Sequence, residues 1–186
     1  MVPAKNLRKG NALMYDGKIQ IVLENSVSKK ARGSAVVKLK LRSIEDNAIR
    51  TITFQGDGLV EPVILEKVKF TCLYFDAQNY YFMNNSTYEQ VAISKTFFDW
   101  EWRFLAENME CELTLSKGKF VAINLPEKVK LRVISAPPAV RGDSINNPQK
   151  DIIVETNFEL KAPLFIKENE YIFISTSTGK YSGKAS

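Results

Sequence analysis

Residues Ser28 to Arg42 read SKKARGSAVVKLKLR. The second half of this stretch alternates aliphatic and basic side chains in the order Val37, Lys38, Leu39, Lys40, Leu41 and Arg42. A period of two predicts a β-strand with one face in a core and the other face basic. The segment Lys18–Leu23 predicts a partner strand. The chain between the two strands is therefore expected to form a hairpin, whose tip carries Lys30, Ala31, Arg32 and Gly33.

Positive charge is concentrated in this part of the chain. Ser28–Arg42 holds six basic residues and no acidic one. Residues 1–62 contain eleven Lys and Arg against six Asp and Glu, which accounts for the whole net charge of +5. Basic hairpin tips are often solvated turns without a function, but a partitioned surface of this kind favours a polyanionic partner.

The composition limits the class of protein. With 186 residues, 45% hydrophobic and 25% charged, the chain is typical of globular proteins. No apolar run is long enough to span a bilayer, and Met1–Gly10 has no apolar core of a signal peptide. Cys72 and Cys111 lie far apart without metal-ligand spacing. We therefore expect a protein of the reducing cytoplasm that does not bind membranes.

The sequence contains no histidine. Histidine is the base of catalytic triads and the commonest metal ligand, so both kinds of site are disfavoured. No Gly-rich phosphate loop of the GxxxxGK type follows a predicted strand. Carboxylate pairs or a lysine could still carry out chemistry, yet the balance is against an enzyme. We expect no catalytic residue, no metal and no cofactor.

Turn signals divide the chain into three strand-rich stretches, residues 1–63, 64–127 and 128–186. The predicted fold class is all-β, with three consecutive small β-barrels. The second stretch also holds one predicted short helix, Lys95–Asn108, with Ser94 as its N-cap. Apolar residues at helical spacing are expected to face the core, and they are Phe97, Trp100, Phe104 and Leu105.

Several motifs, in order along the whole chain, resemble the family of bacterial elongation factor P. They follow the basic hairpin as Leu59–Leu65 (LVEPVIL), Tyr80–Met83 (YYFM), Leu125–Pro126 and Pro138–Ser144 (PAVRGDS). The resemblance implies an SH3-like or KOW-like first barrel, as in other translation proteins, and two OB-type barrels. It also implies an L-shaped arrangement like that of a transfer RNA.

The resemblance implies a function without catalysis. Members of the family bind both ribosomal subunits between the peptidyl and exit sites, as monomers in the cytoplasm. They promote peptide-bond formation at consecutive prolines by positioning the peptidyl-tRNA. The hairpin tip, here Lys29, Lys30, Ala31, Arg32, Gly33 and Ser34, would reach the peptidyl transferase centre.

In this resemblance the modified residue of the family falls on Arg32. Many members carry a β-lysylated lysine there, but an always-charged guanidinium cannot replace an amine as the acceptor. The chain resembles the arginine subgroup in Ala35–Lys38 and Glu61–Leu65. The resemblance therefore implies rhamnosylation of Arg32 by an arginine rhamnosyltransferase that uses dTDP-rhamnose. Lys29 and Lys30 lie nearby and are alternative sites.

A second loop resembles the family's Gly-Asp-Thr loop, which lies near the messenger RNA codon in the exit site. Its residues here are Arg141, Gly142, Asp143 and Ser144, where the serine keeps the hydroxyl. Ser175–Tyr181 departs from the family's pattern by losing an arginine and two acids.

Two alternatives to proline rescue remain open. One is a general single-stranded RNA-binding protein built of OB-type barrels, for which exposed aromatic residues would be the signature. Most aromatic residues here lie in apolar segments and favour a core. The other is a divergent ribosome-binding paralogue without proline rescue.

Overall fold

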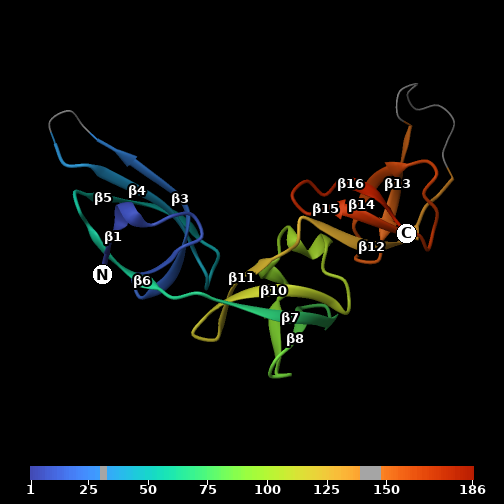
Figure 1. The fold of residues 1–186 in the computed structure, drawn as a ribbon, viewed down its shortest axis with the longest axis horizontal. Coiled ribbons are helices and arrows are strands. Elements are labelled where there is room, and N and C mark those ends of the chain that lie inside the picture. The colour runs from blue at the N-terminus through green and yellow to red at the C-terminus, as the bar shows by residue number, and fades with distance from the viewer. Residues whose placement is uncertain (30–32, 139–147) are drawn as a thin grey trace. The chain divides into compact units, whose positions relative to one another are not determined.

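We describe residues 1–29, 33–138 and 148–186 in a computed structural model (Figure 1). These residues form β-strands and short 3₁₀ turns, with no α-helix among them, which confirms the all-β prediction. They divide into two compact units, Met1–Lys67 with Thr114–Ala122 and Val68–Leu113 with Ile123–Ser186. The division into three domains stays a prediction. No helix in the described ranges has the length and apolar character needed to cross a membrane.

The first unit contains a six-stranded sheet in the order β1-β6-β2-β3-β4-β5. The turn at Asp16 and Gly17 joins β2 to β3, and both residues have positive φ, 53° and 71°. A two-residue turn with positive φ at both positions has a backbone twist that matches the right-handed twist of the strands it joins. The elements are β1 (Val2–Pro3), η1 (Ala4–Asn6), β2 (Ala12–Tyr15), β3 (Lys18–Ser28), β4 (Val36–Ser43), β5 (Ile49–Gln55) and β6 (Leu59–Val63).

The alternation in β4 gives this unit its core. Val37, Leu39 and Leu41 are fully buried, whereas Lys38 between them is exposed. This confirms the predicted strand with one apolar face. A second buried cluster contains Ile19 and Ile21 of β3 together with Val121 from the segment Thr114–Ala122. Strand β3 therefore contributes side chains to two apolar clusters.

The second sheet has five strands in the order β11-β10-β7-β8-β9. Its buried aromatic residues Phe70 and Phe82 lie on β7 and β8, and Cys72 and Cys111 are buried free thiols. The strands are β7 (Glu66–Phe75), β8 (Asn79–Asn84), β9 (Gln90–Ser94), β10 (Met109–Ser116) and β11 (Lys119–Asn124).

The helix predicted over Lys95–Asn108 is wrong. Ser94 does cap a turn, since its hydroxyl accepts the Thr96 N–H at 3.3 Å, but the turn is the 3₁₀ segment η2 (Lys95–Phe97). A second 3₁₀ segment, η3 (Glu101–Arg103), follows. Between them Phe98 leaves helical geometry, with φ −117° and ψ 61°.

Packing and propensity explain this difference. Residues 96–104 are rich in β-branched and aromatic residues, which lose side-chain freedom in a helix. Phe98 is buried with its ring 5.3 Å from that of Tyr80, whereas Phe104 belongs to a different cluster. The segment thus sends aromatic side chains into two cores. Phe104 and Leu105 are buried as predicted, but Trp100 is 38% exposed.

The third sheet has five strands in the order β14-β13-β12-β15-β16. Its core is aliphatic and includes Leu131, Ile152 and Ile172, and Phe104 from the preceding segment belongs to the same cluster. The strands are β12 (Lys128–Ser135), β13 (Gln149–Val154), β14 (Glu159–Pro163), β15 (Tyr171–Ser175) and β16 (Tyr181–Ala185).

Candidate nucleic-acid interface

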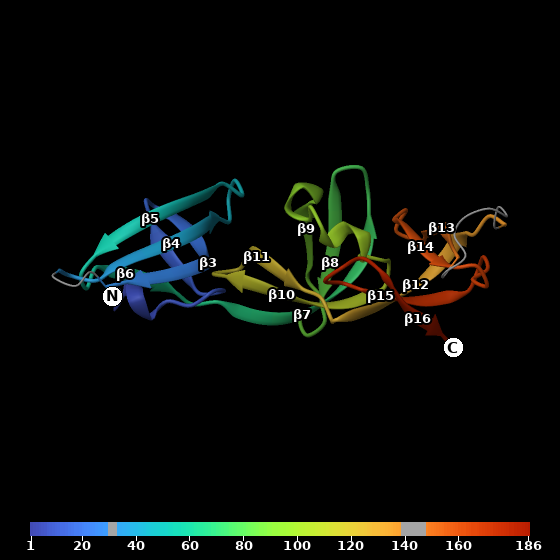
Figure 2. The same cartoon turned by 90° about the horizontal axis from the view of Figure 1, so that it is seen from above.

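The basic hairpin is formed by β3 and β4. The two strands pair from Gln20 opposite Ser43 to Ser28 opposite Val36, with one irregularity between Val22 and Glu24. Figure 2 shows β3, β4 and β5 lying side by side, in agreement with their pairing. The predicted hairpin is therefore confirmed, and it is anchored in a sheet.

The structure describes three of the six predicted tip residues. Lys29 follows the end of β3, and Gly33 and Ser34 precede β4; all three are exposed. Lys30, Ala31 and Arg32 lie outside the described residues. Ser28 and Val36 are cross-strand partners at the ends of the paired strands. Lys29, just after β3, and Ser34, just before β4, therefore lie at the same end of the hairpin.

The loop between β5 and β6 supports this hairpin at the end next to its tip. The Gly56 N–H donates to the carbonyl oxygen of Ala35 at 2.7 Å, just before β4 begins. Gly56 has φ +66°, a conformation that other residues adopt only with strain. The next residue, Asp57, forms an ion pair with Lys5, and the Lys5 hydrogen bond lowers the pKa of the Asp57 carboxyl. The tip end of the hairpin is thus held by residues that lie outside the hairpin itself.

A second support comes from the N-terminal turn η1. The side-chain amide of Asn25 on β3 donates to the carbonyl oxygens of Ala4, Lys5 and Leu7. The Ala4 N–H donates in turn to the Gly58 carbonyl oxygen at 2.9 Å. These contacts join η1, β3 and the loop between β5 and β6 around one end of the hairpin.

The polar face of β4 carries Lys38, Lys40 and Arg42, and the first two differ in their surroundings. Lys38 is exposed between its cross-strand partners Ser26 and Thr53. Lys40 is partly neutralised because its Nζ lies 3.3 Å from the carboxylate of Glu24. Among the residues that the structure describes, Lys29 and Lys38 form no ion pair. Positive charge therefore remains accessible near the tip.

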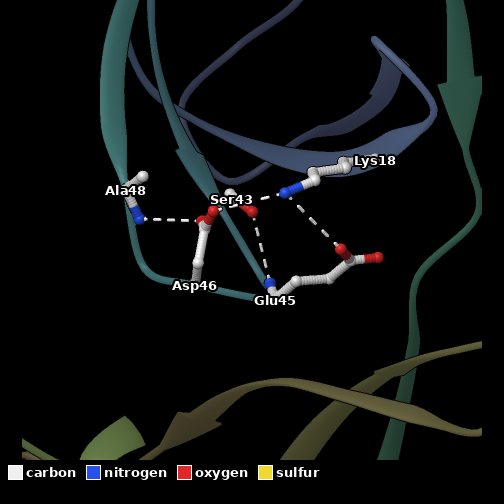
Figure 3. A network of polar contacts seen from close by, with 5 residues as sticks. All are labelled: Lys18, Ser43, Glu45, Asp46 and Ala48. Atoms are coloured by element: carbon white, nitrogen blue, oxygen red, sulfur yellow. Dashed lines mark hydrogen bonds and ion pairs between the residues drawn. The ribbon is translucent and has the colours of Figure 1, made fainter.

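A network at the opposite end of β4 fixes the register of the hairpin (Figure 3). Lys18, the first residue of β3, lies 3.3 Å from the carboxylate of Asp46 and 3.8 Å from that of Glu45. The Ala48 N–H donates to Asp46 at 3.1 Å, and the Glu45 N–H donates to the Ser43 hydroxyl at 3.3 Å. A hydrogen bond from Ser43 is the main reason that the pKa of Asp46 falls to about 2. Since a one-residue slip would turn the basic face inward, this network protects the interface.

The second predicted site, Arg141, Gly142, Asp143 and Ser144, lies outside the described residues. Its flanking strands are described: β12 ends at Ser135 and β13 begins at Gln149. The role assigned to this loop stays a prediction.

The described side chains offer little for covalent chemistry. Burial raises the pKa values of the Cys72 and Cys111 thiols to about 12, so neither is a thiolate at neutral pH. In the described ranges no group of three or more acidic or sulfur ligands could hold a metal ion. What the described part of the hairpin does provide is exposed positive charge on strands that η1 and the loop between β5 and β6 hold in place.

The sequence did not reveal the supports of the hairpin. No motif in the sequence points to Lys5, Asn25 or Gly56 as a support of the hairpin. The Gly-Asp-Gly spacing signalled unusual backbone geometry, but the Lys5–Asp57 contact joins residues 52 positions apart. Such a contact has no local pattern.

The fold and the site together define an all-β protein that presents a basic hairpin anchored in its first sheet. Three family models match this chain. They are described as the Elongation factor P (EF-P) KOW-like domain at residues 3–59, the Elongation factor P (EF-P) OB domain at residues 65–123 and Elongation factor P, C-terminal, at residues 129–184. The chain belongs to the elongation factor P family.

Curated relatives agree over the full length. Elongation factor P of Mycoplasmopsis synoviae (strain 53) is 42% identical over 185 residues, covering 100% of both chains. Elongation factor P of Mycoplasma mobile is 40% identical over 184 residues, covering 99% of this chain and 98% of the relative. These matches confirm the resemblance at the level of the family, whose members are named as translation factors.

A solved structure supports the fold. Eukaryotic translation initiation factor 5A from Methanococcus jannaschii superposes with a TM-score of 0.54 and 21% identity, covering 66% of this chain and 90% of that chain. At this identity the likeness concerns the fold alone. Together with the family models, it confirms the predicted KOW-like and OB-type architecture.

Proposed function

We propose that this chain binds the ribosome between the peptidyl and exit sites and promotes peptide-bond formation at consecutive prolines. The observation that carries the proposal is membership of the elongation factor P family over the whole chain. The accessible charge at Lys29 and Lys38 supports it, because ribosomal RNA and peptidyl-tRNA are polyanions. The factor would act in the cytoplasm as a monomer.

The hairpin suits a positioning role. Proline is a constrained secondary amine with a fixed φ, so its reaction suffers from poor orientation of the reactants. A factor that holds the peptidyl-tRNA in a reactive geometry lowers an entropic barrier while the ribosome performs the chemistry. Such positioning requires a tip on a rigid base. The hydrogen bond between Gly56 and Ala35 and the contacts of Asn25 supply that base.

Arg32 is the proposed site of modification. A guanidinium is the acceptor in the arginine subgroup, and the expected group is a rhamnose transferred from dTDP-rhamnose by an arginine rhamnosyltransferase. The sugar would lengthen the tip toward the acceptor end of the peptidyl-tRNA. Lys29 and Ser34, at the two described ends of the tip, are exposed and leave room for an enzyme to approach.

The loop Arg141–Ser144 is proposed to contact the messenger RNA codon in the exit site. The segment Ser175–Tyr181, which differs from the family's pattern, forms hydrogen bonds within the chain. The Thr176 carbonyl oxygen accepts the Trp100 indole N–H at 2.6 Å, and the Thr176 hydroxyl donates to Pro126 at 2.7 Å. In this chain the segment therefore serves internal packing, which keeps the divergent paralogue as the second candidate.

Tandem mass spectrometry of the hairpin peptide from natively expressed protein tests the modification. A deoxyhexose on Arg32 is the expected result. An unmodified Arg32 would contradict the proposed modification, and a group on Lys29 or Lys30 would show that the register of the tip is wrong.

A polyproline reporter in a host strain that lacks its own factor tests the function. The natively modified chain should restore read-through of consecutive prolines, whereas Arg32→Ala should not. Lys161→Gln, on β14 far along the chain, is the matched control and should behave like the wild type. Ribosome sedimentation without rescue would favour the paralogue, and no sedimentation would contradict both proposals.

A further inference from the structure

Strands β12 and β15 present a face that combines basic and aromatic side chains. Cross-strand pairing places Lys130 opposite Phe173 and Arg132 opposite Tyr171. Tyr171 is 44% and Phe173 is 36% exposed, whereas the residues between them on the strands are buried. We call this surface the basic–aromatic face, and its members are Lys128, Lys130, Arg132, Tyr171 and Phe173.

The geometry of this face brings charge and rings together. The Nζ of Lys130 lies 5.0 Å from the ring centroid of Tyr171, within cation–π range. Tyr171 and Phe173 are two positions apart on one strand, so both rings stand on the same side of the sheet. Each ring thus offers a separate surface with a cation beside it.

The positive charges of the face are not neutralised. Within the described ranges Lys128, Lys130 and Arg132 form no ion pair. The carboxylate beside them is that of Glu155, and its Oε1 accepts the backbone N–H of Arg132 at 2.8 Å. Residues 128–186 hold nine basic and six acidic residues, so the barrel as a whole adds to the positive potential.

A second exposed aromatic pair, Tyr74 and Tyr81, is less suited to stacking with RNA bases than the basic–aromatic face. Tyr74 and Tyr81 stack on each other with ring centroids 4.5 Å apart. The Tyr81 hydroxyl donates to the carboxylate of Asp76 at 2.8 Å. Those rings cover one another next to a negative charge, which would repel a phosphate. Among the described residues, Tyr171 and Phe173 stack on no other ring, and the Tyr171 hydroxyl donates to no carboxylate.

We propose that the basic–aromatic face binds single-stranded RNA. Bases stack on Tyr171 and Phe173, and phosphates contact Lys128, Lys130 and Arg132. Exposed rings interleaved with unpaired cations are the features by which OB-type barrels hold single strands. The cations alternate along β12 at every second residue, which suits a repeating polyanion better than a folded protein partner. The inference stands whether or not the chain rescues proline stalling.

Fluorescence anisotropy with the full-length chain and a fluorescein-labelled single-stranded RNA of about 12 nucleotides tests the proposal. The test variant is the double substitution Tyr171→Thr with Phe173→Thr, because threonine keeps strand propensity and removes the rings. We expect its affinity to fall by at least about fivefold at constant salt. The double variant Lys130→Gln with Arg132→Gln should reduce the salt dependence of binding by about 0.7 in log–log slope per lost phosphate contact.

Matched controls come from the same barrel. Phe165 is 61% exposed and lies off the face, so Phe165→Ser should bind like the wild type, as should Lys167→Gln. All variants should keep the circular dichroism spectrum and the unfolding midpoint of the wild type. Each measurement is repeated in a Lys29→Gln, Arg32→Gln background to remove RNA binding by the basic hairpin.

Photo-cross-linking with RNA that contains 4-thiouridine identifies the residues that contact the RNA. Cross-links on the peptide that carries Tyr171 and Phe173 are expected. The proposal is overturned if the double aromatic variant binds as the wild type in both backgrounds, or if cross-links are confined to the basic hairpin. Equal affinity for duplex RNA would also overturn it, since paired bases cannot stack on the rings.

Discussion

The carboxylate of Asp46 shows how much one turn residue can control. The Ser43 hydroxyl, the Ala48 N–H and Lys18 all stabilise its charged form, and its pKa falls from 3.8 to about 2 (Figure 3). A carboxyl whose pKa is lower in the folded state contributes stability above its unfolded pKa. That contribution is lost as the pH falls from about 4 toward 2.

We predict that Asp46→Asn destabilises the chain at neutral pH and that the difference from the wild type shrinks in acid. The asparagine cannot ionise, so it lacks the stabilisation that the carboxylate gains from Ser43 and Lys18. Thermal unfolding of both proteins between neutral pH and about pH 2 measures the difference. Asp16→Asn is the control, because Asp16 takes a left-handed conformation in a turn that asparagine tolerates. A constant difference between the Asp46 variant and the wild type at all pH values would contradict the linkage.

Single positions differ in how far the sequence predicts them. The burial of Val37, Leu39 and Leu41 follows directly from alternation, because a strand allows only two faces. The Lys5–Asp57 pair could not be predicted, since its partners meet only after several strands have assembled. Arg32 was singled out by its place in a resemblance, and it lies outside the described residues.

At the scale of elements, the basic hairpin depends on a loop that it does not contain. The loop with Gly56 holds the start of β4 by one backbone hydrogen bond to Ala35, and Gly56 takes a left-handed φ of +66°, from which the chain continues into the loop. Glycine is needed for the conformation rather than for space, because an added Cβ would meet only Ser34, at 3.8 Å.

We predict that Gly56→Ala costs about 1–2 kcal/mol of unfolding free energy, the usual penalty for a left-handed alanine. Gly56→Asn should cost less, because asparagine tolerates this region better. Urea unfolding measures both, and hydrogen exchange at the residue 56 amide should accelerate in the alanine variant. Equal stability of the alanine variant and the wild type would show that the loop does not hold the hairpin.

Strands were predicted well and the helix was not, for one physical reason. A period of two is hard to imitate, whereas aromatic residues at 97, 100 and 104 imitate a helical face by chance. The structure uses Phe98 and Phe104 in separate cores, so the two rings do not share the single apolar face that the helical spacing predicted. Tertiary packing thus overrode the local pattern.

At the scale of the whole molecule, the second unit joins two sheets through an aromatic cluster. The Arg103 guanidinium lies over the rings of Trp100 and Trp102, at 4.6 and 4.8 Å, and the Arg103 carbonyl oxygen accepts the Thr156 hydroxyl at 2.7 Å. Phe104 is fully buried in the aliphatic core of the third sheet. The turn spacing of the sequence predicted separate barrels, and it did not show that Phe104 would enter the core of the third sheet.

We predict that Phe104→Ala destabilises the second unit by about 3–5 kcal/mol, the usual cost of removing a buried phenyl ring. Denaturant unfolding followed by circular dichroism measures the loss. The matched control is Phe165→Ala, whose ring is 61% exposed and should cost under about 0.5 kcal/mol. A loss as small as that of the control would contradict the shared core.

The shared core also determines when Phe104 can be buried during synthesis of the chain. Phe104 leaves the ribosome before any strand of the third sheet, so it must wait uncovered until β12–β16 have emerged. The last sheet then closes around a ring that is already in place. A chain whose translation stops before β12 would lack the strands that bury this ring.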